Sequence, residues 1–425
     1  MTDIFSQVQS MQNHSFSFFL TIFLQLGDPT SSGNFQPCPV VESVIVQEVG
    51  TGSAGYVNAL GTDALRERIA LFHSQMGNSV VQARVVDPSH VIVASGCSGA
   101  LDIALRALLD PGTYLLVPNP GFPLYQVIAE SIGAHVLPYN LLPDEEWEVD
   151  LNHVETLVKS AQMRGMEIRG IVVNNPSNPT GAVYTLEHLQ GLVRACDEFC
   201  LPIVADEIYG DLTYVETRPF IPLANVAATI DKNMNVPVMT CSGIGKQFLV
   251  PGWRLGWLVF HDNDAQSLQE VEQGSKQLAQ IVLGASHPAQ TMATQILEAH
   301  VTKSEDMMLW EKALRSKLSL NAALVQEKLA RTPGLFACSA QGAMYVMVTF
   351  DPQHFDFISE GNSPGEQFST KLLEEENVFV LPGSCFGMPN AFRIVFCATE
   401  TVLEQAMLRI FNFSRRHFTD SKAED

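Results

Sequence analysis

The chain has 425 residues, of which 46% are hydrophobic and 17% charged, and its formal net charge is −21. A chain longer than about 250–300 residues is expected to form more than one domain, and this composition is typical of a globular protein with a large core. The acidic balance argues against nucleic-acid binding, because few basic residues are available to neutralise phosphates.

The first notable stretch is an apolar run at residues 16–26. It is too short to span a bilayer, which takes about 20 residues. No Lys or Arg precedes it and no small-x-small cleavage site follows it, so a buried strand leading into the turn at Gly27 is favoured over a secretion signal. The eight cysteines contain no CxxC pair, so neither a disulfide framework nor a metal site is indicated. We therefore expect a cytoplasmic protein, with a mitochondrial location as the alternative, and no membrane partner.

Strands and helices then alternate along the middle of the chain. The expected strands are residues 91–94, 114–117, 136–139, 170–174, 202–205, 236–239 and 255–260, and the expected helices include 62–75, 101–108 and 186–199, around a glycine-rich loop at 50–61. This order predicts an α/β fold with a mostly parallel sheet of about seven strands and helices on both faces. Ligands on such sheets bind beyond the carboxyl ends of the strands.

After residue 304 the strict alternation of strands and helices ends. One long helix is expected at 304–331, followed by shorter elements at 343–350, 366–376, 378–381, 392–396 and 403–413. We expect residues 1–50 to form an N-terminal arm and part of a small α+β domain, 51–310 a large domain, and 311–425 the rest of the small domain. The long helix would join the two domains.

A lysine lies between the two apolar strands at 236–239 and 255–260. Lys246 follows Gly245, and Arg254 comes eight residues later. Burial disfavours the charged form of a lysine, and a neutral amine can form a Schiff base with an aldehyde. The planar fork of Arg254 suits a phosphate. Together the two residues suggest pyridoxal 5′-phosphate (PLP), although a surface lysine in a loop is the ordinary interpretation of Lys246 alone.

Other residues near the predicted strand ends could serve the same cofactor, which needs an anion at its pyridine nitrogen. Each also has an ordinary interpretation, as a helix cap, turn former, core residue or surface ion pair, but their joint order favours a site. The candidates are Asp206 for the pyridine nitrogen, Tyr209 and Asn178 for the phenolic oxygen, Phe122 or Tyr125 for the ring face, and Arg393 for a substrate carboxylate.

With these residues in place, the chain resembles the class I aminotransferases of PLP fold type I, and within them the tyrosine aminotransferase branch. The resemblance runs from about Leu26 to the end. Its motifs are Gly-Asp-Pro-Thr at 27–30, Ser-Gly-Cys-Ser at 95–98, Pro-Gly-Phe at 120–122, Asn-Asn-Pro-Ser-Asn-Pro-Thr-Gly at 174–181, Ala-Asp-Glu-Ile-Tyr-Gly at 205–210, the lysine stretch at 242–256, Gln-Gly-Ala-Met-Tyr at 341–345 and Leu-Pro-Gly at 381–383.

The resemblance implies a role for each matched residue. Lys246 would form the Schiff base and then move a proton, with Asp206 at the pyridinium, Tyr209 and Asn178 at the phenolic oxygen, and Phe122 stacked on the ring. Gly96, Cys97, Ser98, Ser242 and Arg254 would hold the phosphate. Arg393 would bind the substrate carboxylate beside Gly27 and Asn178, and Tyr56 would reach the phosphate of a partner subunit, which implies a homodimer with shared active sites.

The implied reaction moves the amino group of an aromatic, tyrosine-like amino acid to a 2-oxo acid such as 2-oxoglutarate or pyruvate, by a ping-pong route through pyridoxamine phosphate, as in tyrosine catabolism. A carbon–sulfur β-lyase with the same residues is one alternative, and a non-catalytic binding relative is another. The chain departs from the family pattern before residue 26, where the usual polar arm is missing, and at Gln247, where Arg or Asn often stands.

Overall fold

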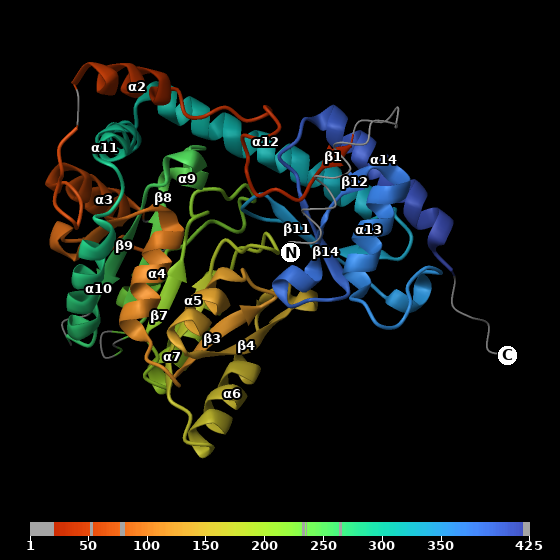
Figure 1. Cartoon of the computed structure of the whole chain (residues 1–425), viewed down its shortest axis with the longest axis horizontal. Coiled ribbons are helices and arrows are strands. Elements are labelled where there is room, and N and C mark those ends of the chain that lie inside the picture. Colours follow the sequence, from red (N-terminus) through yellow and green to blue (C-terminus); the bar gives the residue numbers. More distant parts are fainter. Residues whose placement is uncertain are drawn as a thin grey trace.

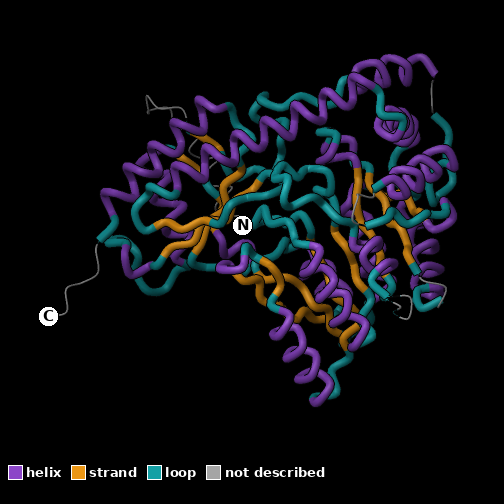
Figure 2. The backbone as a smooth tube through the Cα atoms, turned by 180° about the vertical axis from the view of Figure 1, so that it is seen from behind, coloured by secondary structure: helices purple, strands orange, loops and turns teal. Residues whose placement is uncertain are grey.

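The computed structural model describes residues 21–51, 54–76, 81–231, 234, 236–262 and 266–419. Figures 1 and 2 show two parts side by side: a large sheet covered by helices, and a smaller group of strands and helices built mainly from the C-terminal third. A long helix, α12 (Glu305–Leu329), runs along one edge of the molecule from the first part to the second.

The large sheet contains eight strands in the order β2-β9-β8-β7-β6-β3-β4-β5. All run in one direction except β9 and the two-residue β5, which pair antiparallel with their neighbours. Their near-continuous apolar runs fit strands buried on both faces. The bounds are β2 (Val91–Ala94), β3 (Tyr114–Asn119), β4 (His135–Leu142), β5 (Glu148–Val149), β6 (Ile168–Asn174), β7 (Ile203–Asp206), β8 (Val238–Gly243) and β9 (Gly256–His261).

Helices cover both faces of this sheet because successive strand residues point to opposite sides. Val172 and Val204 pack with α4, α5 and α10, whereas Val173 and Ala205 pack with α6, α7 and α8. The helices of this part are α3 (Asp63–Gln75), α4 (Gly96–Leu108), α5 (Leu124–Ile132), α6 (Leu151–Met163), α7 (Leu186–Glu198), α8 (Leu223–Thr229), α9 (Ile244–Gln247), α10 (Gln269–Val282) and α11 (His287–Val301).

The second part is built on a four-stranded antiparallel sheet, β10-β11-β14-β13. Ile22, Leu24 and Phe35 from the start of the chain are buried in its core, and β1 pairs in parallel with β12. The bounds are β1 (Ile22–Phe23), β10 (Leu335–Ala337), β11 (Tyr345–Phe350), α13 (Pro364–Glu376), β12 (Val378–Phe379), β13 (Leu381–Pro382), β14 (Ala391–Val395) and α14 (Glu400–His417). Helix α2 (Val40–Thr51) packs against α11 of the large part (Figure 1).

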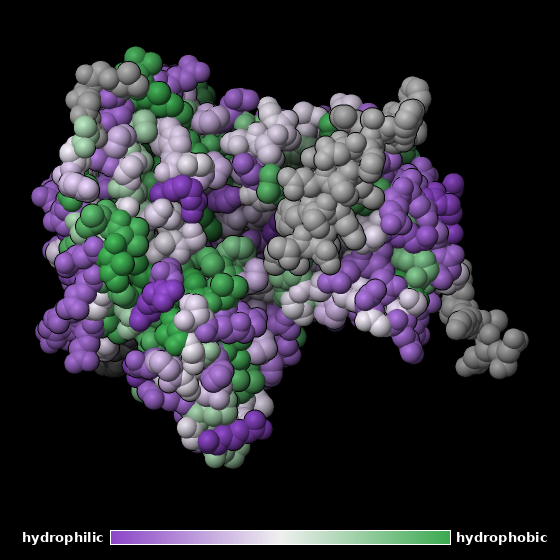
Figure 3. Space-filling model, viewed as in Figure 1, coloured by the Kyte–Doolittle hydropathy of each residue, from purple (hydrophilic) through white to green (hydrophobic). Residues whose placement is uncertain are grey.

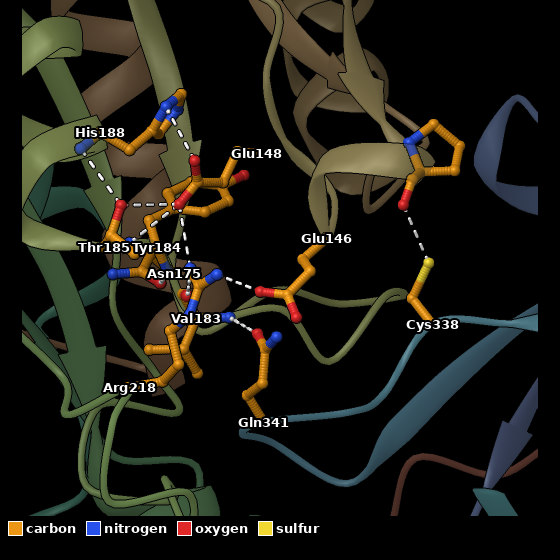
Figure 4. Close-up of polar contacts among 11 residues, drawn as sticks. Glu146, Glu148, Asn175, Val183, Tyr184, Thr185, His188, Arg218, Cys338 and Gln341 are labelled. Atoms are coloured by element: carbon orange, nitrogen blue, oxygen red, sulfur yellow. Dashed lines mark hydrogen bonds and ion pairs between the residues drawn. The ribbon is translucent and has the colours of Figure 1, made fainter.

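Polar contacts join the segment between β10 and β11 to the large part (Figure 4). The side-chain carbonyl of Gln341 accepts a hydrogen bond from the Val183 amide at 2.9 Å, and the Cys338 thiol donates to the Pro143 carbonyl at 3.0 Å. Nearby, Glu148 accepts from the Thr185 hydroxyl at 2.8 Å and from Arg218 at 3.0 Å. The Gln341 and Cys338 contacts join the two parts, and the Glu148 contacts lie within the large part beside them.

The fold expected from the sequence, a mostly parallel sheet with helices on both faces plus a smaller α+β part, is confirmed. Three local expectations need correction. The described part of the 16–26 run forms only the short strand β1, and residues 16–20 lie outside the described residues. The run at 378–381 is divided at Val380 between two sheets. Helix α2 extends into the loop expected at 50–61.

Helices α2, α8, α9, α10 and α11 were not predicted from the sequence. In α10 the buried residues are Ser275 and Ala279, whose small side chains mark a core-facing surface less clearly than large apolar ones do. No helix among the described residues is long and apolar enough to cross a membrane.

Candidate active site

A cavity of about 350 Å³ lies between the carboxyl ends of the large sheet's strands and the small sheet. Its position is the one that open α/β sheets favour for ligands. Residues from nine separate stretches meet there. The residues singled out from the sequence that line it are Gly27, Gly96, Cys97, Ser98, Phe122, Asn178, Asp206, Tyr209, Lys246, Arg254 and Arg393.

Lys246 projects from the short turn of helix that follows β8. The strand ends at Gly243, and α9 begins at the next residue. A Cβ at Gly243 would lie 2.7 Å from the Leu255 carbonyl oxygen, so the close approach of β8 to β9 requires glycine here. The Lys246 ammonium lines the cavity and donates a hydrogen bond to the carbonyl of Gly27. The amine is therefore held at the junction of the two parts.

One end of the cavity is suited to a phosphate. Helix α4 begins at Gly96, and the free N–H groups of its first turn face the site, as in many anion-binding helices. The Arg254 guanidinium donates to the Ser98 hydroxyl at 2.8 Å. Gly96 has φ +75°, and a Cβ there would lie 2.6 Å from the Arg254 guanidinium. Only glycine therefore leaves room for arginine and anion together.

Asp206 provides an anion in the middle of the cavity. Its carboxylate ends β7, is 3% exposed, and accepts a hydrogen bond from the Tyr125 hydroxyl at 2.7 Å. The Cys97 thiol lies 3.6 Å from its other oxygen. Burial raises the pKa of Asp206, and these hydrogen bonds lower it again in part. No Lys, Arg or His in the described part of the chain forms an ion pair with it, so a protonated pyridine nitrogen fits as its missing partner.

Arg393 provides a cation at the opposite end. It lies on β14, is 5% exposed, and donates to the side-chain carbonyl of Asn178 and to the backbone carbonyl of Gln25, both at 2.8 Å. Its Nε has no hydrogen-bond partner among the described residues, and burial lowers the pKa of the guanidinium. Within the described residues no carboxylate pairs with it. This arrangement fits the carboxylate of a substrate, because a buried charge needs a counterion.

Two tyrosines stand between the anion and the cation. The hydroxyls of Tyr209 and Tyr345 are 2.7 Å apart, and their rings meet edge to face at 5.6 Å between centroids. The backbone N–H of Asn178 donates to the side-chain carbonyl of Asn174 at 2.7 Å, which fixes the backbone that carries the Asn178 side chain. Hydrogen-bonding groups are thus available near the middle of the cavity, where a phenolic oxygen would lie.

Two residues implied by the family resemblance do not reach this cavity. Ser242 is buried inside β8 and its hydroxyl lies 3.4 Å from the Glu207 carbonyl, because Gly243 to Gly245 carry the chain onward to the cavity. Tyr56 is 95% exposed and is not among the residues that line the cavity. An exposed side chain of this kind is what a residue acting on a partner subunit would show, but this chain alone does not bring Tyr56 to a site.

Sequence reasoning missed or misplaced three features of the site. Tyr125, weighed against Phe122 as the ring-stacking group, instead binds Asp206 through its hydroxyl, and Phe122 lines the cavity. Tyr345 was not singled out, because one tyrosine in an apolar strand resembles a core residue. The contacts of the Gln25 and Gly27 carbonyls come from the backbone and leave no trace in residue types.

Comparisons with known proteins agree with this geometry. The family model described as "Aminotransferase class I and II" matches residues 21–410. The chain is 36% identical over 399 residues to the tyrosine aminotransferase of Dictyostelium discoideum, covering 93% of this chain and 89% of the relative. It is 36% identical over 398 residues to that of Homo sapiens, covering 93% and 81%.

The solved structure of tyrosine aminotransferase from Leishmania infantum is also similar, with a TM-score of 0.83 and 28% identity over 97% of this chain and 96% of that one. A family match over most of the chain, together with these relatives, assigns the protein. The chain belongs to the class I and II aminotransferase family.

Proposed function

We propose that the protein is a PLP-dependent aminotransferase that moves the amino group of an aromatic amino acid to a 2-oxo acid. The observation that carries the proposal is a pair of buried charges in the cavity that also holds the Lys246 amine: among the described residues, Asp206 has no cationic partner and Arg393 has no anionic one. The names of the relatives at 36% identity support the aromatic substrate and do not favour the β-lyase alternative.

When bound, PLP supplies an aldehyde for the lysine and a ring that withdraws electrons from the substrate Cα. The first turn of α4 and Arg254 would hold its phosphate, and Asp206 would keep the proton on its ring nitrogen. Tyr209 would donate to its phenolic oxygen. Arg393 would bind the substrate carboxylate, and the free Lys246 amine would take the proton from the substrate Cα.

The wall of the cavity supports a substrate with an uncharged side chain. Leu26, Leu124 and Ile208 line it together with aromatic rings, and Lys246, Arg254 and Arg393 are the cationic side chains among the described lining residues. Each of the three already has a proposed role. A second substrate carboxylate would therefore meet no free arginine within the described wall, whereas an apolar ring would contact apolar side chains.

A homodimer is part of the proposal. Figure 3 shows apolar side chains gathered on the face where Figure 1 places α4, α5 and α10. Val127 of α5 is 58% exposed and Ile281 near the end of α10 is 76% exposed. Large exposed apolar areas often mark interfaces, and the exposed Tyr56 could then reach a partner's cavity. A cytoplasmic location is supported by the eight cysteines, none of which is in a disulfide.

Product analysis tests the reaction. The purified protein, supplied with PLP, L-tyrosine and 2-oxoglutarate, should form 4-hydroxyphenylpyruvate and glutamate in equal amounts, and L-aspartate should be a poor donor by comparison. Release of pyruvate and ammonia from a cysteine conjugate, without glutamate, would instead assign the β-lyase reaction. Absence of both reactions in protein that binds PLP would favour a non-catalytic binding role.

A further inference from the structure

Tyr345 contacts two residues to which the proposed function gives a role, Tyr209 at the cofactor and Arg393 at the substrate carboxylate. It is 1% exposed at the start of β11, where it pairs with Val395, and Arg393 lies two residues along the same partner strand. Residues related in this way share one face of a sheet. The Arg393 guanidinium carbon lies 4.4 Å from the centre of the Tyr345 ring. The ring therefore makes a cation–π contact with the guanidinium, as does the Phe386 ring at 4.8 Å.

The hydroxyl of Tyr345 makes a second contact, with the hydroxyl of Tyr209 at 2.7 Å. Each hydroxyl carries one proton, so only one of the two can donate in this pair. Tyr209 lines the cavity and would donate to the phenolic oxygen of PLP, so its own proton is needed there. Tyr345 must then be the donor of the pair. A donor of this kind also polarises Tyr209 and strengthens the hydrogen bond that Tyr209 gives.

The backbone before Tyr345 is fixed to the segments that carry the site. Gln341 is bound by the Val183 amide (Figure 4), and the Gly342 amide donates to the Gly181 carbonyl at 3.0 Å. The Ala343 amide donates to the Leu212 carbonyl at 2.8 Å. Residues 341–343 therefore bridge the segment after Asn178 and the segment after Tyr209. This attachment leaves the Tyr345 ring little freedom to turn away.

We propose that Tyr345 is a positioning residue with two separable parts: its hydroxyl orients the Tyr209 hydroxyl toward the cofactor, and its ring orients Arg393 toward the substrate carboxylate. This inference rests on the proposed function. It assigns the two effects to different atoms of one side chain, so two substitutions can separate them.

The test compares Tyr345→Phe, which removes only the hydroxyl, with Tyr345→Leu, which also removes the ring. The matched control is Tyr139→Phe, because the Tyr139 hydroxyl is equally buried and donates to the Val172 carbonyl at 2.7 Å, away from the cavity. Each PLP-loaded variant is titrated with acid and base while the visible absorption of the bound cofactor is recorded, and kcat and KM are measured with L-tyrosine. Circular dichroism spectra and melting curves show whether each variant is folded.

Tyr345→Phe should raise, by about half a pH unit, the pH at which the cofactor absorption changes. Without the Tyr345 hydroxyl, Tyr209 donates a weaker hydrogen bond to the phenolic oxygen. More negative charge then stays on that oxygen and holds the titrating proton more tightly. The KM of this variant should be unchanged. Tyr345→Leu should show the same shift and, in addition, a KM for L-tyrosine about 2- to 30-fold higher, the range that a cation–π contact spans. Tyr139→Phe should change neither quantity.

The inference is overturned if folded Tyr345→Phe titrates like the wild type, or if Tyr345→Leu keeps the wild-type KM. It is also overturned if Tyr139→Phe gives the same shift, because any lost buried hydroxyl would then have that effect. A wild-type protein that shows no cofactor absorption with PLP would refute the proposed function instead. The two failures are therefore distinguishable.

Discussion

Replacement of Asp206 by Asn should act in opposite directions on cofactor binding and on folding. The substitution keeps the shape of the side chain and an oxygen for the Tyr125 hydroxyl, which lies 2.7 Å from the carboxylate, but removes the negative charge. In the protein without cofactor this charge is buried and has no cation in the described residues around it. With PLP bound, the charge would meet the pyridinium.

The size of the binding effect follows from that contact. A hydrogen bond between charged groups contributes about 1.5–3 kcal/mol net. Its loss corresponds to roughly 10- to 150-fold weaker PLP binding, at about 1.4 kcal/mol per factor of ten. Catalysis should fall further, because the ring nitrogen is no longer kept protonated and the ring accepts charge less well.

The folding effect depends on pH. Because burial raises the pKa of Asp206, the folded protein holds a proton over a range in which the unfolded chain has lost it. The stability of the cofactor-free wild type should therefore decline, relative to the Asn variant, as the pH rises from the ordinary range of a carboxyl through the raised value. Below the ordinary range the two proteins should have equal stability in this respect.

Fluorescence titration with PLP and thermal melts of the cofactor-free protein at several pH values measure the two effects. Asp211→Asn is the control for loss of a carboxylate outside the cavity, since the Asp211 side chain is 36% exposed and does not line the cavity. The control should bind PLP like the wild type. Wild-type PLP affinity in Asp206→Asn, or a cofactor-free variant that is less stable than the wild type at neutral pH, would refute this reasoning.

Two further predictions concern Arg393 and His73. Arg393→Lys keeps the charge but loses the planar fork, so KM for L-tyrosine should rise about 10- to 100-fold while the cofactor spectrum stays the same; a changed spectrum with an unchanged KM would contradict the assignment. His73 is buried, accepts a hydrogen bond from the Trp257 indole at 2.8 Å, and has its pKa lowered by burial to about 4. In the unfolded chain His73 takes up a proton as the pH falls below ~6.5, whereas in the folded protein it does so only at its lowered pKa. The free energy of unfolding should therefore decrease as the pH falls between those two values, by up to about 1.4 kcal/mol per pH unit. His73→Gln should reduce this pH dependence in urea-unfolding curves.

The large fold could be predicted from the sequence because both signals it depends on are local. Apolar runs such as those of β6 and β7 mark strands buried on both faces, and the small residues from Ser95 into the first turn of α4 mark a turn suited to an anion. Lys246, Asp206 and Arg393 could be singled out because charged residues beside apolar strands need a reason for burial.

What the sequence did not reveal depends on orientation. Tyr125 and Phe122 are both aromatic and three residues apart, and only the direction in which helix α5 begins decides that the Tyr125 hydroxyl meets Asp206. Ser242 and Lys246 are four residues apart, but the chain bends at Gly243 between β8 and α9, so only the lysine reaches the cavity. Such choices are made by tertiary packing, which a motif does not encode.

The central claim is that Lys246 is the residue that forms the Schiff base with PLP. Reduction of the PLP-loaded protein with borohydride, followed by proteolysis and mass spectrometry, tests it most directly, since reduction makes the attachment permanent. We expect the added cofactor mass on the peptide that contains Lys246, and no such modification of the Lys246→Ala variant. Attachment mainly at another lysine, or an unchanged yield of modified protein from Lys246→Ala, would contradict the assignment of the active site.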